Sequence, residues 1–114
     1  MPRINLSPRW LASTFVCVGI LVMAQAPIEA ADTARVKIDN FTFAPKVLIV
    51  KAGTAVTFEN DDDIPHVVVA NDGSFRSKAL DTGDSYVFTF TKSGDFPYFC
   101  ALHPHMQGTI TVTP

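Results

Sequence analysis

Short apolar segments with a period of two run through the chain from residue 35 to residue 112 and are separated by turn residues. A period of two places successive side chains on opposite faces of an extended strand, and no helical period persists here for more than one turn. The pattern predicts an all-β fold, a β-sandwich or barrel of about seven short strands. Residues 74–84 fit either a loop or a single helical turn. The expected strands are 35–43, 47–50, 54–59, 67–69, 85–91, 96–100 and 109–112.

Residues 1–30 have the layout of a secretory signal peptide. Residues 1–9 carry two arginines and no acidic residue, and residues 10–26 form an apolar run. Small residues follow, and we expect cleavage after Ala30, which would export a single domain of residues 31–114 to the periplasm. A retained membrane anchor is the alternative, but the apolar run is at the short end for a spanning helix.

The exported domain keeps a single thiol, because Cys17 leaves with the signal peptide and Cys100 remains. It therefore cannot form an internal disulfide, and an odd thiol in an oxidising compartment is a liability unless something occupies it. Metal ligation is such an occupation. The whole chain has a formal net charge of −2 and no basic patch, so nothing in it indicates a nucleic-acid partner.

Near the C-terminus, Cys100, His103 and Met106 follow one another with the spacing Cys-x2-His-x2-Met. Thiolate, imidazole and thioether are together the ligands of a copper electron-transfer site, in which two His and one Cys lie in a trigonal plane and a Met binds at a long axial distance. Residues 101–107 form the tight connection between two expected strands, so the loop can fold its own His and Met back toward the thiol. Gly108 ends this loop and allows a backbone conformation that other residues resist.

The second imidazole must come from elsewhere, because so short a loop cannot surround a metal. His66 supplies it at the start of its own expected strand. From the residues alone the loop ligand stays open, since His103 and His105 both lie within reach of the thiol. The acidic run 61–63 is expected to be a solvated turn that places negative charge near His66 and slightly disfavours both anionic partners and reduction.

Several segments resemble a known family in their order along the chain. The chain resembles the small blue-copper proteins of the cupredoxin family, closest to the amicyanin and plastocyanin branch, over residues 31–114. The matching segments are Phe41-Thr42-Phe43-Ala44-Pro45, Lys51-Ala52-Gly53-Thr54, Phe58-Glu59-Asn60, Ile64-Pro65-His66 and the Cys100 loop, whose short spacing is that of amicyanin.

This resemblance implies a Greek-key β-sandwich with one type 1 copper ion that cycles between Cu(I) and Cu(II). It implies His66, Cys100, His103 and Met106 as the copper ligands. It also implies that the Asn60 side chain ties the two ligand-bearing loops together, as an outer-shell group that orients the ligands. The chain departs from amicyanin at His105, where the amicyanin loop has an aromatic residue.

The function predicted from these residues is electron transfer by a periplasmic protein that shuttles one electron between redox partners. The electron would leave through His103, and partners would dock transiently on an apolar patch around it. The patch residues are Pro65, Ala101, Leu102 and Pro104. The protein is expected to be a monomer.

Enzymatic activity is not expected, because all four ligand positions are filled and no open site remains for a small-molecule substrate. Three histidines in the whole chain cannot build the additional cluster of a multicopper oxidase. Nothing supplies the third group that would orient a Cys/His nucleophile pair. The alternative function is periplasmic copper storage or delivery by the same ligands.

Overall fold

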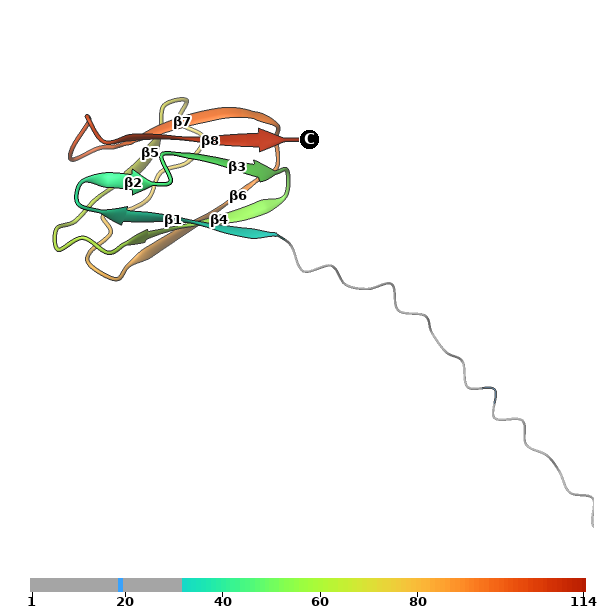
Figure 1. Ribbon diagram of the computed structural model, residues 1–114, viewed down its shortest axis with the longest axis horizontal. Coiled ribbons are helices and arrows are strands. Elements are labelled where there is room, and N and C mark those ends of the chain that lie inside the picture. Colours follow the sequence, from blue (N-terminus) through green and yellow to red (C-terminus); the bar gives the residue numbers. More distant parts are fainter. Residues whose placement is uncertain (1–18, 20–31) are drawn as a thin grey trace, which may run out of the picture.

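Eight strands form two sheets in the computed structural model, which describes Gly19 and residues 32–114 (Figure 1). The strands are β1 (Thr33–Asp39), β2 (Thr42–Ala44), β3 (Val47–Lys51), β4 (Thr54–Asn60), β5 (Val68–Ala70), β6 (Ser85–Phe90), β7 (Gly94–Cys100) and β8 (Gln107–Thr113). The described residues contain no helix, and therefore none that could cross a membrane. The predicted all-β sandwich is confirmed. The predicted signal peptide, residues 1–30, lies outside the described residues except for Gly19.

The two sheets have the strand orders β2-β1-β4-β6 and β3-β8-β7-β5. Each sheet contains one parallel pair, β1 with β4 and β3 with β8, and its other pairs are antiparallel. Alternate residues of β4 are fully buried, as expected for a strand with one face on the core. The core between the sheets is aliphatic and aromatic, and its principal members are Val36, Ile38, Val56, Phe58, Phe75, Phe90, Tyr98, Ile110 and Val112.

The extra strand arises because the expected strand 35–43 reverses direction in its middle. Asn40 and Phe41 both have positive φ, 49° and 58°, and β1 and β2 pair on either side of them in an antiparallel hairpin. Two central residues with positive φ define a type I′ turn, which favours Asn followed by Gly. Left-handed backbone costs a residue with a side chain about 1–2 kcal/mol, so Phe41 occupies a strained position.

Residues 74–84 form an irregular segment rather than a helical turn. This segment runs beside β5 and the residues that precede it. Isolated bridges join Val69 to Arg76 and His66 to Leu80. The segment therefore supports the backbone of His66, which precedes β5.

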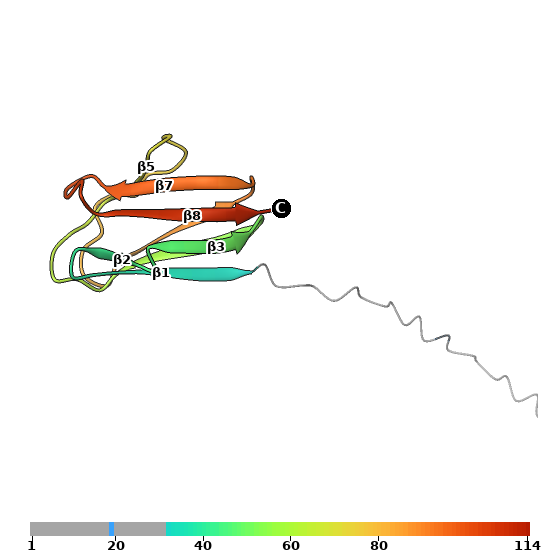
Figure 2. The same cartoon turned by 45° about the horizontal axis from the view of Figure 1, so that its top comes forward.

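Three connections gather at the end of the sandwich opposite the C-terminus, as the views in Figures 1 and 2 show. They are the β1–β2 turn, the loop that follows β4, and the β7–β8 connection. Four of the five segments that resemble a copper protein therefore meet at one end of the fold. The fifth, Lys51-Ala52-Gly53-Thr54, is the β3–β4 turn at the other end, where the Ala52 N–H donates to the Thr113 carbonyl.

Candidate metal centre

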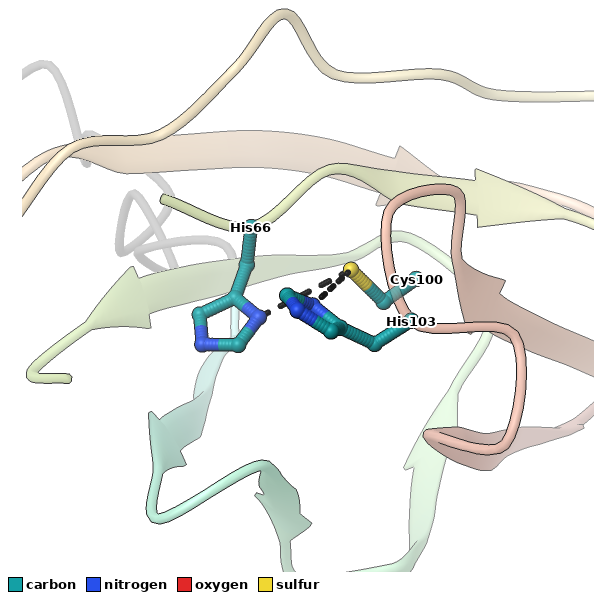
Figure 3. A group of neighbouring side chains, drawn as sticks. All are labelled: His66, Cys100 and His103. Atoms are coloured by element: carbon teal, nitrogen blue, oxygen red, sulfur yellow. Dashed lines mark hydrogen bonds between the residues drawn. The ribbon is translucent and has the colours of Figure 1, made fainter. Parts of the chain in front are cut away.

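One thiol and two imidazoles meet at this end of the sandwich (Figure 3). The donor atoms of His66, Cys100 and His103 all lie within 4.8 Å of one another. Cys100 Sγ is 3.6 Å from His66 Nδ1 and 3.8 Å from His103 Nδ1. His66 and Cys100 are fully buried, whereas His103 is half-buried.

This spacing fits a shared metal ion. Nitrogen and sulfur donors that lie about 2.0 and 2.3 Å from one ion, at trigonal angles of about 120°, are about 3.7 Å apart. The two measured Sγ–Nδ1 distances bracket that value. A thiolate with two imidazoles is also the trigonal donor set of a blue-copper site.

The β7–β8 connection holds its own ligand candidates in place through backbone hydrogen bonds. The His103 N–H donates to the Cys100 carbonyl at 3.2 Å, and the Met106 N–H donates to the His103 carbonyl at 2.9 Å. The Cys100 N–H in turn donates to the Met106 carbonyl at 3.0 Å. Met106 is buried, whereas His105 is exposed and is not part of the donor cluster. The fold thus brings His103, and not His105, to the thiol.

His66 is fixed from the opposite side by residues outside the β7–β8 connection. Its backbone N–H and carbonyl both bond to Leu80, at 3.1 and 2.8 Å. The next residue, Val67, donates its N–H to Cys100 Sγ at 3.4 Å. A hydrogen bond to the sulfur is one of the features that tune the reduction potential of a copper–thiolate site.

Asp62 was not recognised from the sequence, and the prediction of a solvated turn is wrong for it. Its side chain is buried, and Oδ2 lies 3.0 Å from His66 Nε2 while it accepts the Phe41 N–H at 3.1 Å. The hydrogen bond with His66, followed by that from Phe41, lowers the pKa of Asp62 to about 2. The available signal was a carboxylate four residues before a candidate histidine ligand.

Asn60 is also fully buried, and its hydrogen bonds differ from those that the resemblance implies. Nδ2 donates to the carbonyls of Ile64 and Leu80, both at 2.8 Å, and Oδ1 accepts the Asp62 N–H at 2.9 Å. These bonds fix the loop that precedes His66 and join it to the segment around Leu80. Within the part of the chain that the structure describes, they do not reach the Cys100 loop.

Phe41 is a second residue that sequence reasoning missed at the site. Its ring packs edge-on against both imidazoles, with centroid distances of 5.1 Å to His103 and 5.9 Å to His66. The ring is 49% exposed, so it belongs to the surface as well as to the site. The only sign of it in the sequence was the Asn40-Phe41 pair. The alternating pattern continues through this pair, so the chain reversal there was not predicted.

Gly108 is required for space rather than for its backbone conformation. It is not among the residues with positive φ in the described chain, which corrects the expectation from the sequence. A methyl group at this position would collide with the ring and hydroxyl of Tyr98, which is buried beside it. The close approach of β7 and β8 beneath the loop therefore depends on this glycine.

Comparison with known proteins agrees with this geometry. A family model described as a cupredoxin-like domain matches residues 12–112. Amicyanin-alpha from Methylorubrum extorquens is 31% identical over 107 residues, which cover 89% of this chain and 87% of that protein. Plastocyanin from Scenedesmus fuscus is 35% identical over 83 residues, which cover 61% of this chain and 85% of that protein.

Among solved structures, a copper-containing nitrite reductase from Thermus scotoductus is 35% identical with a TM-score of 0.68. The match covers 72% of this chain but only 22% of that enzyme's chain. The family model covers most of the sequence, and the donor cluster at the end of the sandwich is of the type 1 copper kind. The chain therefore belongs to the cupredoxin-like family and is a blue-copper protein similar to amicyanin and plastocyanin.

Proposed function

We propose that the protein is a periplasmic electron carrier that passes one electron at a time between redox partners. The observation that carries this proposal is the cluster of His66, Cys100 and His103, whose donor atoms lie within 4.8 Å of one another. These residues and Met106 would hold one copper ion, which supplies the one-electron couple when bound. Ligands held by a rigid sandwich on both sides of the site would keep rearrangement on electron transfer small.

Partners would dock around His103. This half-buried imidazole packs against the exposed ring of Phe41, and its sequence neighbour Leu102 is 51% exposed. Pro65 and Pro104 are exposed as well. A small apolar surface suits brief encounters better than stable association, in keeping with a monomeric carrier.

Export to the periplasm is the location that we propose, with the signal peptide cleaved near Ala30. The apolar segment 10–26, the single thiol left after cleavage and the similarity to amicyanin support this proposal. N-terminal sequencing of protein from the periplasmic fraction would test it. A cytoplasmic protein that begins at Met1 would contradict it.

Catalysis is not part of the proposal, although one similar structure is a nitrite reductase. The matched part is less than a quarter of that enzyme's chain, since only 22% of it is covered. The chain has three histidines in all, and His66 and His103 would be occupied as ligands. His105 alone cannot supply the several ligands that a second metal centre would need.

The test is the optical spectrum of purified protein loaded with Cu(II). We expect an intense blue colour from thiolate-to-copper charge transfer, which Cys100→Ser should abolish and His105→Phe should leave in place. A colourless Cu(II) complex would reject the site. Loss of colour in His105→Phe would reject the choice of His103 as ligand.

A second measurement separates a carrier from a storage or delivery protein that uses the same ligands. A carrier should exchange electrons with itself much faster than it loses copper to a chelator. Rapid copper loss with slow self-exchange would favour storage or delivery.

A further inference from the structure

We propose that Asp62 and Phe41 act as a positioning pair that holds both imidazoles of the copper site. A single carboxylate oxygen, Asp62 Oδ2, lies 3.0 Å from His66 Nε2 and accepts the Phe41 N–H at 3.1 Å. The ring of Phe41 then packs against His66 and His103. This inference rests on the proposed function, because the imidazoles matter as ligands only if copper binds.

Asp62 determines which nitrogen of His66 can bind a metal. Nδ1 faces Cys100 Sγ at 3.6 Å, so ligation requires that the proton of the neutral ring sit on Nε2. A carboxylate that accepts the Nε2–H fixes this tautomer and the ring orientation. It also makes Nδ1 a more basic ligand, which donates its electron pair more strongly to a metal ion. The ring is 0% exposed, so bulk solvent does not reach Nε2 to supply that acceptor instead.

The carboxylate is itself held by the backbone of its loop. Oδ1 of Asp62 accepts the Asp63 N–H at 3.0 Å, and the Asp62 N–H donates to Asn60 Oδ1 at 2.9 Å. The Thr82 hydroxyl donates to the Asp62 carbonyl at 2.6 Å. Such a support restricts the carboxylate to one position, which is what a positioning residue needs.

Phe41 holds the other imidazole. Within the described chain the only side-chain hydrogen-bond partner of His103 is Cys100, so its ring orientation depends on packing. The Phe41 ring meets His103 edge-on at a centroid distance of 5.1 Å and an interplanar angle of 87°. It meets His66 in the same way at 5.9 Å and 88°. One aromatic ring therefore packs against both imidazoles while it remains 49% exposed to solvent.

The backbone strain at Phe41 points to this role. A bulky residue at a φ of 58° persists only where its surroundings hold it, and residues in such conformations concentrate at functional sites. Glycine would satisfy the turn without strain but would leave the imidazoles uncovered. The hydrogen bond from the Phe41 N–H to Asp62 holds the strained turn and links its position to that of His66.

The test of Asp62 compares Asp62→Asn with Asp61→Asn. Both variants remove one negative charge from the same loop, but Asp61 is exposed and its carboxylate lies 3.6 Å from Lys37 Nζ. We expect Asp62→Asn to weaken copper affinity by about 10- to 100-fold and to raise the reduction potential above that of the parent and of Asp61→Asn. Equal effects of the two variants would reject the assignment of Asp62.

The test of Phe41 uses Phe41→Gly, with Phe41→Leu as the variant that keeps apolar bulk. We expect Phe41→Gly to weaken copper affinity by about tenfold, measured by competition with a chelator, and Phe41→Leu to weaken it less. The melting temperature of the apoprotein should not fall in proportion, because glycine relieves the strained turn. Unchanged affinity, or a loss of affinity that only follows a loss of apoprotein stability, would reject the assignment of Phe41.

A readout on the unmodified apoprotein does not depend on any variant folding. Nitrogen-15 NMR of the imidazole nitrogens should show the His66 proton on Nε2, and a proton on Nδ1 would overturn the inference. The two levels of the proposal can fail separately. A parent protein that is not blue with Cu(II) rejects the proposed function, whereas a blue parent with indistinguishable Asp62 and Asp61 variants rejects only the positioning pair.

Discussion

Gly108 shows how one residue sets the spacing beneath the ligand loop. It is buried on β8 opposite Tyr98 of β7, and the two residues are direct partners in the antiparallel register. The aromatic ring fills the volume that a side chain at residue 108 would need. The strand that leads to Cys100 and the strand that leaves the loop can therefore pair closely at this level.

Gly108→Ala should destabilise the fold, because the added methyl group forces the Tyr98 ring or the β8 backbone to shift. Overpacking of this kind costs about 1–3 kcal/mol in the free energy of unfolding, and chemical denaturation of the apoprotein would measure it. Gly73→Ala tests backbone strain in place of packing, since the position has open space but a φ of 77°. An unchanged denaturation midpoint for Gly108→Ala would contradict the packing explanation.

Some site residues can be predicted from the sequence and others cannot. The difference lies in how far apart in the sequence the residues that define each role are. The local spacing of Cys100, His103 and Met106 predicts them as ligands, and the need for a second imidazole predicts His66. Asp62 and Phe41 gain their roles from a hydrogen bond between positions 21 residues apart. No periodic pattern in the sequence shows that one carboxylate of an acidic run is buried and bonds to the β1–β2 turn that contains Phe41.

At the scale of elements, the loop from Asn60 to His66 behaves as one unit. The Asn60 side chain donates to the Ile64 carbonyl within the loop and to the Leu80 carbonyl of segment 74–84, and it accepts the Asp62 N–H. His66 bonds through its own backbone to Leu80. The irregular segment 74–84 therefore supports this ligand loop, because Asn60 and His66 both bond to its Leu80. The sequence left the conformation of this segment open, since the bond from an amide side chain does not belong to a regular strand pair.

Asn60→Ala should loosen this element. It leaves the Ile64 carbonyl and the Asp62 N–H without their Asn60 partner and removes one of the two hydrogen bonds that the Leu80 carbonyl accepts. We expect the free energy of unfolding to fall by about 2–4 kcal/mol, with weaker copper binding. Thermal or chemical denaturation and a chelator competition would measure both effects. The exposed Asn71 provides the control Asn71→Ala, which should change neither. Equal stability losses in the two variants would show that the Asn60 hydrogen bonds do not hold the loop.

At the scale of the whole molecule, the two-sheet sandwich was predictable because alternation and turn residues repeat along the chain. The break at Asn40 and Phe41 was not, since the Asn-Phe pair lacks the glycine that usually marks a two-residue hairpin. Both sheets extend to the end where the ligands meet, and the four ligand candidates come from two separate parts of the chain. Copper would therefore join the loop before β5 to the β7–β8 connection across the end of the sandwich.

Removal of copper should lower the stability of the whole domain, because an ion that binds only the folded state shifts the unfolding equilibrium. Free copper at 100 times the dissociation constant adds about 2.7 kcal/mol. For a domain of about 80 residues this raises the melting temperature by about 10–20 °C. Scanning calorimetry of apoprotein and copper-loaded protein would measure the shift, and Cys100→Ser should lose most of it. Equal melting temperatures with and without copper would show that the ion does not join the two parts of the site in the folded protein.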